Sequence, residues 1–130
     1  MLKNKSFFQI TKISRSRLPS LPFSIIKDTI IGKKYNLSLV FITSFKIKKL
    51  NKIYRNINKP TDILSFPLTP ETGEIFICPS ETQKERLKFD RTYNNFLLYL
   101  FIHGLVHLKG YDHGPKMDKI EEKFRKRFNI

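Results

Sequence analysis

The chain has 130 residues, a length that suits one domain, because folding at this size buries roughly two-thirds of the surface of the unfolded chain. Apolar residues make up 40% of it and include 12 Phe and 5 Tyr, which excludes an intrinsically disordered protein. The 25 Lys and Arg against 11 Asp and Glu give a net charge of +14. This favours a polyanionic partner such as RNA, DNA or an anionic membrane surface, although codons rich in A and T also favour lysine.

A membrane span needs about 20 apolar residues. The apolar run at 96–102 is followed by His103 and His107, which predicts a buried helix with no membrane segment. The N-terminal stretch has no apolar run of signal-peptide length. Cys78 is the single cysteine, and its apolar neighbours predict a small buried side chain. We therefore expect a cytoplasmic protein.

Hydrophobic periodicity and turn residues predict four elements in the first half of the chain. They are a strand at 7–13, a helix that begins near Pro22 and ends before Gly32, a strand at 35–43 and a basic helix that begins at Ser44. The apolar residues of the basic helix recur at helical intervals and predict its packed face; they are Ile47, Leu50, Ile53, Tyr54 and Ile57. Lys48, Lys52 and Arg55 share a face, and the simplest interpretation of most of its lysines is a solvated surface.

The second half predicts a hairpin followed by helices. Strands at 62–68 and 74–78 are joined by a turn that contains Pro70 and Gly73. A short helix begins at Pro79, a longer one capped by Asp90 or Thr92 runs to Leu108, and a charged helix spans 116–128. The predicted fold class is therefore α+β: a small mixed β-sheet of about four strands with helices packed on it.

All three histidines of the chain fall within the segment HGLVHLKGYDH. His103 and His107 are four residues apart, so on a helix their imidazoles project from one face. Gly110 permits a sharp reversal of the chain after the helix, which returns His113 toward the other two. Three neutral imidazoles suit zinc and leave a fourth tetrahedral position for water. The sequence predicts a zinc site at the end of a central helix.

The spacing of the histidines also matches the zinc motif of metzincin proteases. Those enzymes place a glutamate directly after the first histidine as general base, and here that position is Gly104. A protease would need a glutamate from elsewhere in the chain, so this alternative is the least favoured of those considered.

The histidine segment resembles the signature H-G-x-L-H-L-x-G-Y-D-H of the YbeY family, with Val106 in place of the usual leucine. A second segment, KPTDILSFP at 59–67, is similar to the K-P-T-[DN]-V-L-S-F-P pattern of that family. LNKIYR at 50–55 and GEIFIC at 73–78 resemble two further family segments in the same order. Together these segments identify the chain as a member of the family over about residues 35–128.

The resemblance implies a metal-dependent endoribonuclease that cuts single-stranded RNA, takes part in maturation of the 16S rRNA 3′ end and in ribosome quality control, and works with the small ribosomal subunit. It implies one zinc ion per chain, held by His103, His107 and His113, in one domain that spans 1–130. It also places Arg55 at the position of a functionally important arginine, where a guanidinium can hold a phosphate.

Two questions stay open at this point. The first is whether the zinc is catalytic or belongs to an RNA or ribosome assembly factor with a structural metal and little cutting; a structural site would be closed by a fourth protein ligand. The second is which groups assist the histidines. Asp112 is a candidate partner of a ligand histidine or a turn cap, Tyr111 is expected to pack, Asp62 is a candidate proton acceptor, and Thr61 and Ser65 are expected to shape the cleft.

Overall fold

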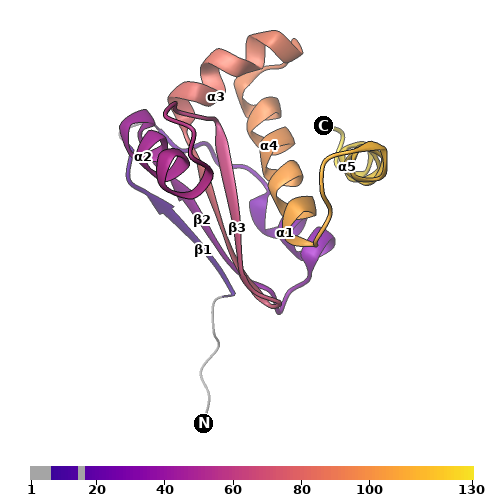
Figure 1. Ribbon diagram of the computed structural model, residues 1–130. Helices are drawn as coiled ribbons and strands as arrows, with labels where there is room; N and C mark the ends of the chain where they lie inside the picture. Colours follow the sequence, from indigo (N-terminus) through magenta and orange to yellow (C-terminus); the bar gives the residue numbers. More distant parts are fainter. Residues whose placement is uncertain (1–6, 15–16) are drawn as a thin grey trace.

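Four strands form one mixed sheet in the computed structural model, which describes residues 7–14 and 17–130 (Figure 1). The strands are β1 (Phe8–Lys12), β2 (Asn36–Phe41), β3 (Ile63–Thr69) and β4 (Thr72–Ile77), in the order β1-β2-β4-β3. β1, β2 and β4 are parallel, whereas β3 runs antiparallel to β4. The predicted α+β class, mixed sheet and hairpin are therefore confirmed, and β3 is an edge strand. The prediction that the N-terminal stretch carries no signal peptide concerns residues that lie partly outside the described ranges.

Within the described ranges, five α-helices and one 3₁₀-helix connect and follow the strands. They are α1 (Phe23–Ile31), α2 (Ser44–Arg55), α3 (Pro79–Glu85), η1 (Arg86–Phe89), α4 (Tyr93–Leu108) and α5 (Pro115–Arg127). The predicted helices are confirmed with small shifts of their ends, and η1 was not predicted. Thr92 is the residue that caps α4, because its hydroxyl accepts a hydrogen bond from the backbone N–H of Asn95.

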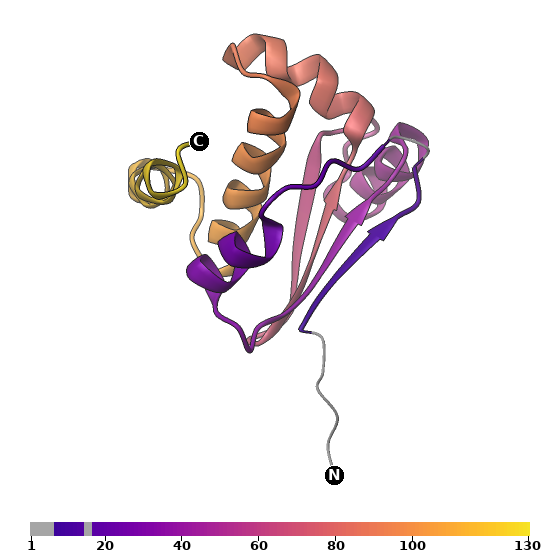
Figure 2. The same ribbon diagram turned by 180° about the vertical axis from the view of Figure 1, so that it is seen from behind.

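The helices α1 and α4 cover one face of the sheet, and α5 lies on the side of α4 that is turned away from the strands (Figures 1 and 2). The core between them contains alternate residues of the central strands, such as Leu37, Leu39, Ile75 and Ile77. α4 is apolar around most of its circumference and buries ten of its residues. It is therefore the central helix of the fold, and side chains on its few open positions are held rigidly.

α2 covers the opposite face of the sheet. Its Ile47 is buried in a second core cluster with Val40 and Leu64, whose side chains alternate with those of the first core. The prediction of a packed face is wrong for Ile53 and Ile57, which are exposed. Tyr54 is also exposed, but its ring packs against that of Phe66, with 5.1 Å between the ring centroids. Instead the buried side-chain amide of Asn51 donates to the carbonyl of Lys59 and ties the end of the helix to the following loop.

Gly104 lies at a close contact between α4 and the β-hairpin. A Cβ at this position would lie 2.9 Å from the Oγ of Ser65 and 3.0 Å from a methyl carbon of Ile75. We expect Gly104→Ala to lower the free energy of unfolding by about 1 to 3 kcal/mol, because the extra methyl group pushes α4 from the sheet. Urea denaturation measures this, with the exposed Asn94→Ala on the same helix as control; equal stability of Gly104→Ala and the parent would refute it.

Candidate metal centre

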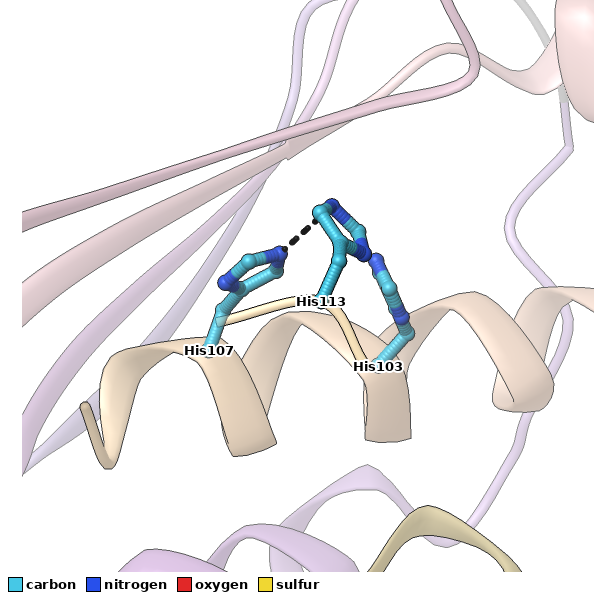
Figure 3. Close-up of side chains that lie close together, drawn as sticks. All are labelled: His103, His107 and His113. Carbon is cyan, nitrogen blue, oxygen red and sulfur yellow. Dashed lines mark hydrogen bonds between the residues drawn. The ribbon is translucent and has the colours of Figure 1, made fainter. Parts of the chain in front are cut away.

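Two of the three histidines are held by the buried helix α4, and the third by the loop that follows it. His103 and His107 lie one turn apart on α4, and their rings project from the same side of the helix (Figure 3). Gly110 has φ +104° and Gly114 has φ +150°, backbone angles that suit glycine. Between these two residues the chain reverses, so that His113 lies over α4 beside the other two rings.

The ring nitrogens of the three histidines converge. One nitrogen from each ring lies within 4.8 Å of the others, and the Nε2 atoms of His107 and His113 are 3.1 Å apart. Two imidazole nitrogens that bind one zinc ion at about 2.0–2.1 Å in tetrahedral geometry are roughly 3.3 Å apart. The three imidazoles are thus a donor set that suits zinc, and the His107–His113 pair is close to this spacing. The predicted convergence of the three histidines is confirmed.

The lowered pKa of His107 also suits metal binding. Burial lowers the pKa of His107, and the positive charge that His103 and His113 can carry lowers it further, against a smaller opposing hydrogen bond with the backbone of Tyr111. A lowered pKa keeps the imidazole neutral near pH 7, which is the form that binds a metal.

A buried carboxylate from α5 orients one of the rings. The Nδ1–H of His103 donates to Oε1 of Glu121 at 3.0 Å, and Glu121 is only 4% exposed. Arg125, one turn further along α5, lies 3.6 Å from the same oxygen. This arrangement leaves Nε2 of His103 as the nitrogen directed at the other two rings. Asp112 was predicted to be either the partner of a ligand histidine or a turn cap. Its side chain is exposed, and the carboxylate that contacts His103 is that of Glu121.

We expect Glu121→Gln to weaken zinc binding by about 10-fold, because Gln keeps the volume but loses the charge that makes His103 a better ligand. Competition with a coloured chelator measures the affinity directly, without any assay of activity. Glu122→Gln is the matched control, since Glu122 is exposed and pairs with Lys126. Equal zinc affinity of the two variants would show that the Glu121 contact has no influence on the metal.

The three histidines open onto a cavity of about 210 Å³, lined in addition by Arg55, Thr61, Asp62, Ile63 and Ser65. Arg55 is the last residue of α2, on the other face of the sheet, and it reaches this cavity where β3 forms the edge of the sheet. The structure therefore brings together the candidate ligands, the candidate arginine and the candidate proton acceptor Asp62. Thr61 and Ser65 line the cleft as predicted, and Tyr111 packs against the core.

Asp62 is the single carboxylate among the described residues that line this cavity. Burial raises the pKa of its carboxyl group, and the negative charge of Glu85 raises it further, whereas hydrogen bonds from the backbone of Asp62 and Ile63 and the charge of His103 oppose the shift. A carboxyl group with a raised pKa, in one cavity with candidate metal ligands and an arginine, is a candidate group for proton transfer.

The raised pKa of Asp62 predicts a pH dependence of stability in the metal-free protein. The folded state holds this proton more tightly than the unfolded chain, so stability falls as the pH rises from the ordinary carboxyl pKa of 3.8 through the raised one. We expect Asp62→Asn to equal the parent below this window and to be more stable above it. Denaturation of chelator-treated protein over a pH series measures this; the same pH profile in both proteins would contradict it.

The position at which a metzincin-type protease carries its general base is closed. Gly104 points toward Ser65, Ile63 and Ile75 on the sheet, and not even a Cβ fits there without displacement. A glutamate side chain at this position would therefore have to displace Ser65, Ile63 or Ile75. Steric exclusion therefore agrees with the sequence in disfavouring a protease of this kind.

Fold and site together define a small α+β protein with a three-histidine centre that can hold a metal ion, set in a cavity with an arginine and a carboxylate. In the part of the chain that the structure describes, no helix is both long and apolar enough to cross a membrane.

The family model described as "Endoribonuclease YbeY" matches residues 6–129. Proteins of that name from Thermosipho melanesiensis and Aliarcobacter butzleri are each 36% identical to the chain, over 75% and 86% of its length and 77% of theirs. The solution structure of TM1509 from Thermotoga maritima is similar, with a TM-score of 0.64 at 25% identity over 94% of this chain and 91% of that one. The chain belongs to the YbeY family of endoribonucleases.

Proposed function

We propose that this chain is a zinc-dependent endoribonuclease that cuts single-stranded RNA and contributes to maturation of the 16S rRNA 3′ end and to ribosome quality control. The observation that carries the proposal is the convergence of three histidine nitrogens on a cavity that also holds Arg55 and Asp62, in a member of an endoribonuclease family. One domain, residues 1–130, would supply the whole site.

Each side chain has a distinct role in this proposal. His103, His107 and His113 hold one zinc ion per chain, and Glu121 fixes the orientation of the first ring. The zinc ion supplies Lewis-acid chemistry, which activates water and polarises a phosphoryl oxygen. The guanidinium of Arg55 binds the phosphate to be cut and offsets the negative charge that grows on it. The Asp62 carboxylate accepts a proton from the attacking water and can return it to the leaving oxygen.

The alternative, an assembly factor with a structural zinc, would require a closed site with a fourth protein ligand. Among the described residues, the group with metal-binding geometry consists of the three histidines alone. Cys78 is buried, and its Sγ lies 3.3 Å from the hydroxyl of Ser80. The set of three ligands beside a cavity supports the hydrolase over the structural site.

The proposed partners are single-stranded ribosomal RNA and the small ribosomal subunit, encountered in the cytoplasm. A net charge of +14 supports binding both to free RNA and to the RNA of the ribosomal subunit, because each lysine or arginine that contacts a phosphate releases a counterion. The single, buried cysteine is compatible with the reducing conditions of that compartment.

The test is elemental analysis of the purified protein, followed by cleavage of single-stranded and double-stranded RNA with and without a chelator. We expect about one zinc per chain, a content typical of a three-ligand site, and cutting of the single strand that stops with the chelator and returns with added zinc. Bound zinc without any cutting would favour the assembly factor. Absence of metal would refute the whole site.

A further inference from the structure

The surface of α2 carries a groove that the metal centre does not use. It has a volume of about 300 Å³ and is lined by Phe45, Lys48, Lys49, Lys52, Ile53 and Asn58, which we call the α2 groove. Two of these residues are large, apolar and open to solvent: Phe45 is 66% exposed and Ile53 is 71% exposed. Because both line the same groove, they offer one shared apolar surface to a ligand.

The charge of the groove indicates the chemistry of that ligand. Three of its lining residues are lysines, none is acidic, and α2 as a whole contains no Asp or Glu. The ammonium group of Lys49 lies 4.4 Å from the centre of the Phe45 ring, so charge and aromatic surface are interleaved. Lysines that follow a phosphate backbone, beside an aromatic ring on which a base stacks, are typical of sites for single-stranded nucleic acid.

The groove is also connected to the metal centre along the helix. Lys48, Lys52 and Arg55 are spaced four and three residues apart, so they form one row about 10 Å long on the surface of α2. Lys48 and Lys52 line the groove, whereas Arg55 lines the cavity of the histidines. A phosphate backbone that passes Arg55 can therefore continue past the two lysines.

We propose that the α2 groove binds the part of a single-stranded RNA that flanks the cut bond, with the lysines on its phosphates and a base stacked on Phe45. This rests on the proposed function and names a second contact region of the same substrate. It predicts that long substrates bind more tightly than short ones, because only a strand of several nucleotides reaches both the metal centre and the groove.

The first experiment compares a substrate of about 12 nucleotides, within the range for single-stranded sites, with one of about 2, below that range, on the zinc-loaded protein. The groove variant combines Lys48→Gln, Lys49→Gln and Lys52→Gln. The control variant, Lys33→Gln with Lys34→Gln and Lys119→Gln, removes the same charge from exposed lysines outside α2.

We expect the groove variant to raise KM for the long substrate by at least about 10-fold. The slope of the logarithm of its binding constant against the logarithm of the salt concentration should become shallower by about 2, because three phosphate contacts contribute roughly 0.7 each. Its kcat, and kcat/KM for the short substrate, should stay at the parent values. If the groove and control variants had the same KM and salt slope, the inference would be overturned. A protein partner would then be the alternative ligand of the groove.

A second experiment does not depend on cutting. The chain contains no tryptophan, so Phe45→Trp introduces a single reporter into the groove, and Ile25→Trp places one on the exposed surface of α1. We expect single-stranded RNA with phosphorothioate links to quench the first reporter by stacking and to leave the second unchanged. If RNA left both reporters unchanged, the groove would not be its site. RNA-dependent quenching in a protein that never cuts would instead refute the proposed function and keep the groove.

Discussion

His113→Ala is expected to abolish stable zinc binding and, with it, RNA cleavage. The variant leaves His103 and His107 on α4 as two ligands, which is fewer than the three that catalytic zinc sites use. The loop after Gly110 also loses the bond through the metal that ties it to α4. We therefore expect far less than one zinc per chain by elemental analysis, no cutting above background, and a melting temperature that a chelator no longer lowers.

The control for this prediction is the neighbouring residue. Asp112 is exposed, so Asp112→Ala should keep its zinc and its cutting while it alters the same loop. Retention of about one zinc per chain by His113→Ala would show that His113 is not a ligand, whatever the activity of the variant. Loss of zinc from both variants would instead indicate that the conformation of the loop, and not the imidazole, holds the metal.

Arg55→Ala is expected to keep the metal and to lose the chemistry. Arg55 lines the cavity but is not one of the three converging ligands, so zinc content and affinity should match the parent. Removal of one group that stabilises developing charge lowers kcat by about 100- to 1000-fold in other hydrolases, and we expect a loss in that range here. Single-turnover cleavage measures this step apart from product release.

Two further variants define the role of the guanidinium. Arg55→Lys should recover only part of the rate, because an ammonium keeps the charge but cannot bind a phosphate with two parallel hydrogen bonds. Arg127→Ala, which removes an exposed arginine from the end of α5, should leave the rate unchanged. A normal rate in Arg55→Ala would remove Arg55 from the site, and a loss of zinc from it would make the arginine a structural support.

Local patterns were sufficient to predict the elements and the convergence of the three histidines. Alternating and helical periodicities predicted the strands and the α-helices, since each depends on residues only a few positions apart. The three histidines lie within one turn of helix and one loop, so the spacing of His103 and His107, with Gly110 after them, already determined that their rings converge. The family segments around them carried the same information in a longer form.

Local patterns could not predict the contacts between segments that are far apart in the sequence. Glu121 reaches His103 from another helix, and Arg55 joins the histidines around an edge strand, because the packing of whole elements sets these distances. Periodicity predicted an apolar face for α2 but not how much of it the sheet would cover, so Ile53 and Ile57 were wrongly expected to pack. The sequence by itself determined the elements and the segment that holds the three histidines. The tertiary structure decided which side chains lie beside that segment and which stay exposed, since side chains from distant segments meet only where elements pack.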